Sequence, residues 1–244
     1  SEVIGTRELS LRFDSPYQEK TPRGAPRLDQ IAPGVLRLNG AASNYHSHFV
    51  IGDQAIVVFD TPVSSSETAQ AKALLEKNFS TKPITHIVLS HTHRDHIGGL
   101  TSYAKHGTTV YVGAGGSTAL ARQFPSQLQA RVKETHHHEV IDLGQRRIHL
   151  YAVPSSHATD MLVAYDEVSG ILFQGDFFTL SERGPVAVAF DVNQELMDFI
   201  TQQKLEVSAI VGVHGRITSV QELRESLHLR ASQNRTEHAE RTQL

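Results

Sequence analysis

The sequence predicts an α/β fold, a four-layer αββα sandwich in which two mixed β-sheets pack face to face and helices cover their outer faces. Two observations predict this fold. Each half of the chain contains several short runs of β-branched and aromatic residues, typical of strands, together with amphipathic segments of helical spacing. The chain has 244 residues, of which 39% are apolar and 20% charged, and this composition suits one globular domain with a sizeable core.

The first half is expected to contribute five strands and three helices. The strand-like runs cover residues 35–39, 46–52, 54–60, 84–90 and 108–114. The helical segments cover residues 64–79, 98–107 and 116–124. Ser64 and Glu67 stand in capping-box spacing at the start of the first helix, and we expect Gly98-Gly99 to form the tight turn into the second.

The second half is expected to contribute five strands and two helices. The strand-like runs cover residues 139–144, 146–154, 161–166, 170–176 and 208–215. A helix over 193–205 precedes the last of these strands. A final helix begins at Ser219, in capping-box spacing with Glu222, and runs to about residue 230.

The chain is expected to form one domain with two flanking segments. Residues 1–30 contain three prolines and show neither helical nor strand period, which predicts an arm or linker. Residues 31–230 form the domain, and residues 231–244 form a polar C-terminal tail. The chain begins with Ser1 instead of Met, so we expect a processed form or a piece of a longer precursor.

Composition excludes several classes of function. The 23 Lys and Arg residues against 26 Asp and Glu residues give a net charge of −3, which argues against a nucleic-acid partner. No apolar stretch approaches the roughly 18 to 20 residues that a membrane span requires. The absence of cysteine excludes disulfides, thiolate zinc sites and cysteine nucleophiles. Fifteen histidines are the unusual feature of the composition.

The histidines are densest in the segment His91-Thr-His93-Arg-Asp95-His96, directly after the continuously apolar run over 84–90. In an extended backbone, alternate side chains lie on the same side, so His91 and His93 can converge on one cation. Asp95 and His96 follow where the chain turns into a helix, and can face a second cation a few ångströms away. Burying such polar side chains without partners costs roughly 1 to 3 kcal/mol each, which favours a metal centre over an exposed polar loop.

This segment resembles the HxHxDH signature of the metallo-β-lactamase superfamily, and the resemblance covers about residues 31–230. Three further ligand-type residues end apolar runs in the family's order, namely His157, Asp176 and His214. The resemblance implies the metallo-β-lactamase fold for this catalytic domain and two metal positions. The first is held by His91, His93 and His157, the second by Asp95, His96 and His214, and Asp176 bridges the two. This nitrogen and oxygen donor set suits two zinc ions, with manganese or iron as alternatives.

The predicted site favours a dinuclear hydrolase. Two cations about 3.5 to 4 Å apart can share a hydroxide, because they lower the pKa of bound water from 15.7 toward about 7. The expected substrate is a small molecule with an ester, lactone, thioester or β-lactam bond. We assign Asp95 a catalytic role in proton transfer to the leaving group. The sequence assigns no substrate-binding residues and no oligomeric state.

Differences between this sequence and known branches of the superfamily narrow the function that the resemblance implies. Asp176 stands where the best-known lactamase branch carries Cys, which favours the branch of glyoxalase II, lactonases and ribonuclease Z. Only 30 residues follow His214, too few for the helical domain with which glyoxalase II holds glutathione, and nothing resembles the tRNA-gripping arm of ribonuclease Z. Alkylsulfatase-like and flavodiiron members are much larger chains. We therefore expect a compact bacterial hydrolase, in the periplasm or secreted rather than cytoplasmic.

Three alternatives stay open. A mononuclear Fe(II) oxygenase similar to persulfide dioxygenases would use His91, His157 and Asp176 as its two-His, one-carboxylate set. A phosphoester hydrolase is chemically close, because two metals also suit in-line displacement. A non-catalytic binding module is disfavoured, because such members usually lose ligands and all seven are present here.

The remaining histidines and serines receive weaker interpretations. His46 and His48 alternate in one run and favour a structural or substrate-rim role over a metal role. The triplet 136–138 favours a solvated loop. Five other histidines have no companion ligands in the sequence, namely His86, His106, His149, His228 and His238. Ser155 and Ser156 either contact substrate or satisfy the backbone.

Overall fold

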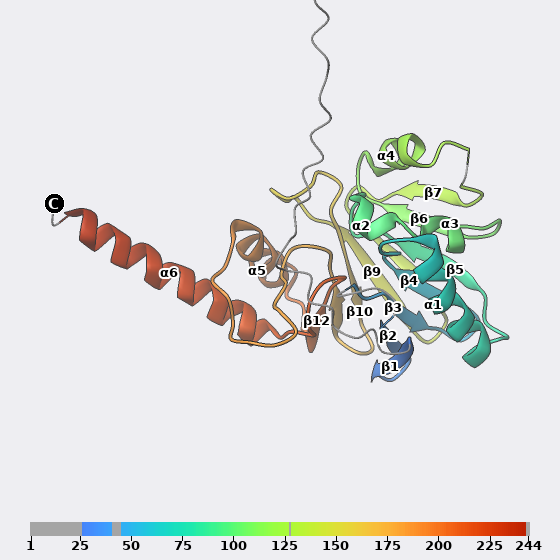
Figure 1. Ribbon diagram of the computed structural model, residues 1–244, viewed down its shortest axis with the longest axis horizontal. Helices are drawn as coiled ribbons and strands as arrows, with labels where there is room; N and C mark the ends of the chain where they lie inside the picture. The colour runs from blue at the N-terminus through green and yellow to red at the C-terminus, as the bar shows by residue number, and fades with distance from the viewer. Residues whose placement is uncertain (1–25, 41–44, 127, 243–244) are drawn as a thin grey trace, which may run out of the picture.

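The computed structural model of the chain describes residues 26–40, 45–126 and 128–242. Two β-sheets pack face to face and helices lie on their outer sides (Figure 1). Both sheets are mixed, so the predicted αββα sandwich is confirmed.

The first sheet has seven strands in the order β1-β2-β3-β4-β5-β6-β7. They are β1 (Arg27–Ala32), β2 (Val35–Asn39), β3 (His48–Ile51), β4 (Ile56–Phe59), β5 (Ile84–Val88), β6 (Thr109–Val112) and β7 (Arg131–Glu134). The strands from β1 to β4 pair antiparallel, and those from β4 to β7 pair parallel. The parallel part needs a crossover between successive strands, and each of its three crossovers contains at least one helix.

The second sheet has five strands in the order β12-β11-β10-β9-β8. They are β8 (His138–Asp142), β9 (Arg147–Ala152), β10 (Leu162–Asp166), β11 (Ile171–Phe173) and β12 (Ala209–Val211). β8 to β11 form an antiparallel meander, and β12 joins β11 in parallel.

Three apolar clusters separate the four layers. The helices are α1 (Ser65–Asn78), α2 (Arg94–Ile97), α3 (Leu100–Tyr103), α4 (Gly116–Gln123), α5 (Asp191–Gln203) and α6 (Val220–Thr242). Neighbouring residues of one strand serve different layers: in β4, Val58 packs under α1 and α3, whereas Val57 packs between the two sheets. The rings of Phe59 and Phe173 stack at 3.9 Å across this seam. A third cluster lies between the second sheet and the helices α5 and α6.

The structure differs from the predicted elements in four places. β1 begins at Arg27, inside the range predicted as an arm, because Leu28 and Ile31 pack against the core; residues 1–25 lie outside the described residues. β7 was not predicted, since its sequence RVKE is polar. The predicted helix over 98–107 is reduced to the short helix α3, and an unpredicted short helix, α2, precedes it.

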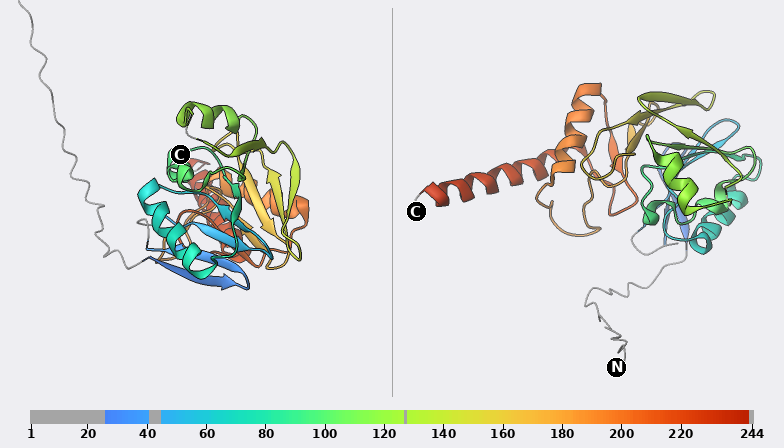
Figure 2. Two further views of the ribbon diagram at one scale, coloured as in Figure 1. Left: turned by 90° about the vertical axis from the view of Figure 1, so that its right-hand side faces the viewer. Right: turned by 90° about the horizontal axis from the view of Figure 1, so that it is seen from above.

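The fourth difference is the length of the last helix. α6 continues to Thr242, through most of the range predicted as a polar tail, and its distal part projects beyond the sandwich (Figures 1 and 2). The described side chains from residue 231 to residue 236 are all exposed, so no apolar period marks this part in the sequence. Over the described part of the chain, no helix is both long and apolar enough for a membrane span.

Candidate metal centre

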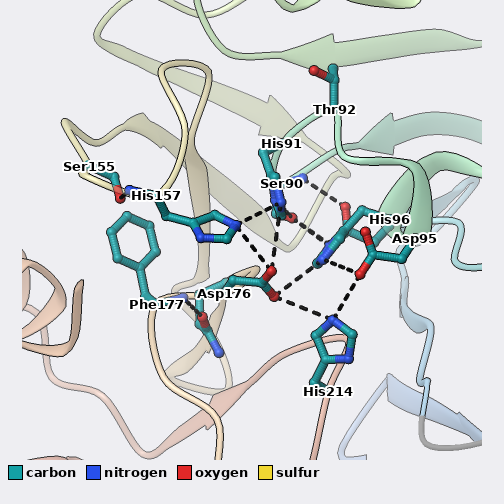
Figure 3. Close-up of polar contacts among 12 residues, drawn as sticks. Ser90, His91, Thr92, Asp95, His96, Ser155, His157, Asp176, Phe177 and His214 are labelled. Atoms are coloured by element: carbon teal, nitrogen blue, oxygen red, sulfur yellow. Dashed lines mark hydrogen bonds and ion pairs between the residues drawn. The ribbon is translucent and has the colours of Figure 1, made fainter. Parts of the chain in front are cut away.

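The seven predicted ligands lie at the carboxyl ends of strands, along one edge of the sandwich, and Figure 3 labels all of them except His93. The first sheet provides the His91 to His96 segment, which follows β5 and ends in α2. The second sheet provides the other three: His157 after β9, Asp176 after β11 and His214 after β12. The structure brings all seven side chains into two adjacent groups that share Asp176.

The first group contains His91, His93, His157 and Asp176. The Nε2 atoms of His91 and His157 are 3.3 Å apart. Oδ2 of Asp176 lies 3.2 Å from Nε2 of His157 and 3.8 Å from Nε2 of His91. The ring of His93 lies 4.4 Å from that of His91 and 4.9 Å from that of His157, centroid to centroid.

The second group contains Asp95, His96, Asp176 and His214. The other oxygen of Asp176, Oδ1, lies 3.2 Å from Nε2 of His96 and 3.5 Å from Nε2 of His214. Oδ2 of Asp95 lies 3.3 Å from Nε2 of His214 and 3.7 Å from Nε2 of His96. The two oxygens of Asp176 therefore face different groups, as a bridging carboxylate requires.

The donor atoms fit metal ions in two respects. Ligands about 2.0 to 2.1 Å from a tetrahedral zinc ion stand roughly 3.3 Å from each other, and the donor atoms described above are spaced in this range. Nε2 of His96 and Oδ1 of Asp176 are buried and make no hydrogen bond to any described group. Buried polar atoms of this kind normally have a partner, and a cation in the second group, which both atoms face, would supply one. Metal binding itself is a prediction that metal analysis tests.

Asp60 is a functional candidate that the sequence interpretation missed. It ends β4, is buried, and its Oδ2 lies 3.1 Å from Nδ1 of His96, while Ser90 donates to it from both N and Oγ at 2.7 Å. A carboxylate on the second ring nitrogen of a histidine fixes its tautomer and directs the first nitrogen toward a metal. The available signal was a carboxylate at the end of an apolar run, the same pattern that identified Asp176.

Asp160 has a similar supporting role on the first group. Its Oδ2 accepts hydrogen bonds from N and Oγ1 of Thr92, at 3.0 and 2.7 Å. Thr92 lies between His91 and His93, so this carboxylate fixes the backbone that spaces them. Ser155 acts on the backbone too, because its Oγ accepts a hydrogen bond from N of His157.

The electrostatics of the chain without metal show where positive charge is favoured. Burial lowers the pKa of His91 to about 2, so its imidazole is neutral and its lone pair is available to a metal. Burial also opposes charge on His96, but the contacts and charges of Asp176 and Asp60 outweigh it and raise its pKa to about 10. A proton on His96 thus occupies the place of a cation among these carboxylates, and a metal ion displaces it on binding.

Gly98 and Gly99 form the predicted turn into a helix, directly before α3, and Gly98 has a further role. Neither Gly98 nor Gly99 has a positive φ. A Cβ on Gly98 would lie 2.0 Å from the carbonyl oxygen of Val63. The glycine therefore permits close approach between α2 and the loop after β4, which is also tied to α2 by the hydrogen bond from N of Val63 to O of Asp95 at 3.1 Å.

A cleft of about 570 Å³ opens beside Asp95. Tyr45 forms one wall, and its ring packs edge-on against His214 with centroids 4.8 Å apart. Burial, followed by the charges of Asp95 and Asp176, raises the pKa of the Tyr45 hydroxyl, which therefore stays protonated at neutral pH. No sequence pattern selects Tyr45, because its position depends on the pairing of residue 45 with residue 214.

The other histidines lie outside the two groups. His46 and His48 are buried; Nε2 of His46 lies 2.9 Å from Oε1 of Glu182, in agreement with a structural role. The solvated-loop expectation is wrong for His138, which begins β8 and whose Nε2 lies 3.1 Å from Nδ1 of His149. His149 therefore does have a companion. The side chains of Glu67 and His238 lie outside the described residues.

Comparison with known proteins decides the family. A model of the metallo-beta-lactamase superfamily matches residues 42–214, well over half of the chain. The chain belongs to this superfamily. The match ends at the last of the seven predicted ligands, so it contains the whole candidate metal centre of this superfamily member.

Individual relatives in the superfamily differ in their reactions. The chain is 27% identical over 154 residues to a coenzyme F420H(2) oxidase of Methanocaldococcus jannaschii, which covers 61% of this chain and 37% of that protein. A metallo-β-lactamase from Hirschia baltica shares the fold with 15% identity and a TM-score of 0.65, over 85% of this chain and 98% of the other. A variant of the flavo di-iron protein from Thermotoga maritima does so with 18% identity and a TM-score of 0.64, over 83% and 61%. The chain thus spans well under half the length of the curated relative that it matches.

Proposed function

We propose that this protein is a dinuclear metal-dependent hydrolase that cleaves an ester, lactone, thioester or β-lactam bond of a small molecule. The observation that carries the proposal is Asp176, whose two carboxylate oxygens face two complete sets of donor atoms. A mononuclear site would leave His96 and His214 without a role, although both face the same carboxylate.

The chain's residues have distinct tasks in this reaction. The first ion would be held by His91, His93 and His157, the second by Asp95, His96 and His214, and both by Asp176. Two zinc ions bound there would lower the pKa of bound water toward about 7 and would act as a Lewis acid for the carbonyl oxygen. Asp60 fixes the orientation of His96, and Asp160 fixes the backbone of Thr92 between the ligands His91 and His93.

Asp95 is placed for proton transfer. Its side chain is 41% exposed, against 21% for Asp176, and it lines the cleft. Its Oδ2 faces His214 and His96, which leaves Oδ1 to accept the proton of the attacking water and pass it to the leaving group. Tyr45, a protonated hydroxyl on the same cleft, can donate a hydrogen bond to the substrate.

The experiment is elemental analysis of protein purified without added metal, followed by a panel of lactones, thioesters, esters and β-lactams. We expect about two zinc or manganese ions per chain and hydrolysis of at least one class. His157→Ala should empty the first position and His214→Ala should weaken the second, each with loss of hydrolysis. Full activity in both variants overturns the two-metal scheme.

A second candidate is an iron-dependent oxidoreductase, favoured by the similarity to a coenzyme F420H(2) oxidase and to a flavo di-iron protein. Zinc has no redox chemistry, so an oxidase requires another metal. Bound iron with oxygen consumption, and no hydrolysis across the panel, would select this function over the hydrolase.

A further inference from the structure

The cleft beside Asp95 has the size and walls of a small-molecule site. Its volume of about 570 Å³ lies within the range of roughly 300 to 1,000 Å³ that ligand pockets occupy. Four apolar or aromatic side chains line it, namely Tyr45, Val63, Ile97 and Phe124. The polar lining residues are Ser64, Ser65, Arg94, Asp95 and Gln123, and polar groups in such a site fix the orientation of a bound molecule.

Arg94 supplies the charge of this cleft. Among the lining residues that the structure describes it is the one cation, it is exposed, and it forms no ion pair with any described residue. The neighbouring carboxylate of Asp95 faces His214 and His96. Its negative charge therefore interacts with the metal centre. Gln123 is also engaged, because its amide nitrogen donates to the carbonyl of Thr92 at 2.9 Å.

The position of Arg94 in the sequence brings its charge close to the reaction. It stands between His93 and Asp95, one ligand from each metal group, at the first residue of α2. Arg94 and Asp95 both line the cleft, so a molecule bound there can contact the guanidinium and extend to the metal centre at Asp95. Arginine presents several N–H donors in a planar fork that matches the two oxygens of a carboxylate.

Val63 is another lining residue of the cleft, and its backbone is constrained. It is a β-branched residue with φ of 70°, and its side chain is 38% exposed at the cleft. Such a backbone is costly and persists where surrounding structure enforces it, often at ligand sites. Here the tie to Asp95 and the close contact with Gly98 hold it, and the apolar side chain is presented to the cleft.

We propose that the cleft selects small substrates with an apolar body and a carboxylate, and that Arg94 is the specificity-determining residue that binds this carboxylate. The inference rests on the proposed hydrolase function. The apolar walls take the body of the substrate, Arg94 takes its anionic end, and the scissile carbonyl lies at the metal centre. No bond to Arg94 forms or breaks in the reaction.

The first test compares two 4-nitrophenyl esters on the zinc-loaded protein, the monoester of glutaric acid and the ester of pentanoic acid. They differ only in a terminal carboxylate against a terminal methyl group. We expect the wild type to prefer the glutarate ester in kcat/KM, and Arg94→Ala to lower that preference about 10- to 100-fold, mainly through KM, since a charge-assisted contact is lost. Using the ratio removes any common effect of the substitution on the metal centre, and zinc content is measured for each variant.

Two further variants define the role of the charge. Arg94→Lys should retain part of the preference, because the charge stays and the planar fork is lost. Arg224→Ala is the matched control: it removes an exposed arginine from α6 that makes no ion pair with any described residue, and should leave the ratio unchanged. An equal preference in wild type and Arg94→Ala overturns the inference.

A binding measurement separates this inference from the proposed function. Calorimetry on the zinc-loaded protein compares the anilide of glutaric acid, which keeps one free carboxylate, with the anilide of pentanoic acid. Tighter binding of the glutaric anilide by wild type than by Arg94→Ala supports the inference even when no ester is hydrolysed, and that combination overturns only the hydrolase function. Identical binding to both proteins overturns the role of Arg94, whatever the esters show.

Discussion

Asp60→Asn changes one buried atom behind the metal centre and tests whether Asp60 controls metal affinity. The two oxygens of Asp60 receive three contacts: N of Ser90 at 2.7 Å, Oγ of Ser90 at 2.7 Å and Nδ1 of His96 at 3.1 Å. Asparagine has one acceptor oxygen, so its amide group must face N of Ser90 or Nδ1 of His96, both donors. A buried donor left unpaired costs about 1 to 3 kcal/mol.

The loss of metal-binding free energy should be similar to this cost of an unpaired donor. Loss of a carboxylate from a ligating histidine lowers metal affinity about 10- to 100-fold, and 1.4 kcal/mol corresponds to each factor of ten. We expect this loss at the second position, to which His96 belongs, and a smaller effect at the first. The assay is competition for zinc with a chromogenic chelator, together with urea unfolding in excess EDTA to measure the stability of the metal-free chain.

The control is Asp166→Asn. Asp166 is also buried and accepts hydrogen bonds from N and Oγ of Ser169, but it is the last residue of β10, before the turn to β11, and belongs to neither metal group. The Asp166→Asn protein should be less stable than the wild type and should bind zinc with the affinity of the wild type. An Asp60→Asn protein that is folded and binds both zinc ions within twofold of the wild type would refute the reasoning.

Three other substitutions test separate features. Asp176→Ala should reduce bound zinc from about two ions per chain to nearly none, since it removes a donor from both groups; elemental analysis that finds one full position would contradict the bridge. Gly98→Ala should lower the free energy of unfolding by about 1 to 3 kcal/mol, because its Cβ would meet the backbone of Val63, and an unchanged melting temperature would disprove this. Burial, followed by the charge of Arg37, holds the pKa of His48 well below 6.5, so the unfolded chain takes up a proton below pH 6.5 that the folded chain refuses. Stability should therefore fall toward acid by up to about 1.4 kcal/mol per pH unit, and His48→Gln should flatten that slope in urea unfolding at about pH 7, 6 and 5; equal slopes in both proteins would exclude His48 as the cause.

Sequence patterns predicted the elements whose side chains alternate or repeat regularly. The apolar run that contains β5 was correctly identified as a buried strand, and the five runs predicted in the second half of the chain correspond to the five strands of the second sheet. β1 and β7 were missed because only Leu28, Ile31 and Val132 mark their buried sides, and polar residues surround them. Helix α6 was cut short because its exposed distal part has no core to face.

The candidate site was predictable where ligand-type residues end apolar strands. All seven predicted side chains do meet, since strand ends of both sheets share one edge. Tyr45, Arg94 and Asp160 could not be assigned, because each acts through a contact between segments far apart in the sequence or through an opening that the chain forms only when folded. Asp60 carried a usable signal, and the error was to treat it as the end of an ordinary strand.

Each donor group is drawn from both sheets: His91 and His96 come from the first, while His157, Asp176 and His214 come from the second. Ions held there would cross-link the two sheets, because each ion would be coordinated by residues of both. Either sheet alone would provide too few donor atoms to retain the ions. Tight metal binding would therefore show that the two sheets are packed together. Removal of the ions by a chelator should weaken the packing of the two sheets first along this edge. Phe59 and Phe173 lie between the sheets, and their backbone amides should then exchange hydrogen faster.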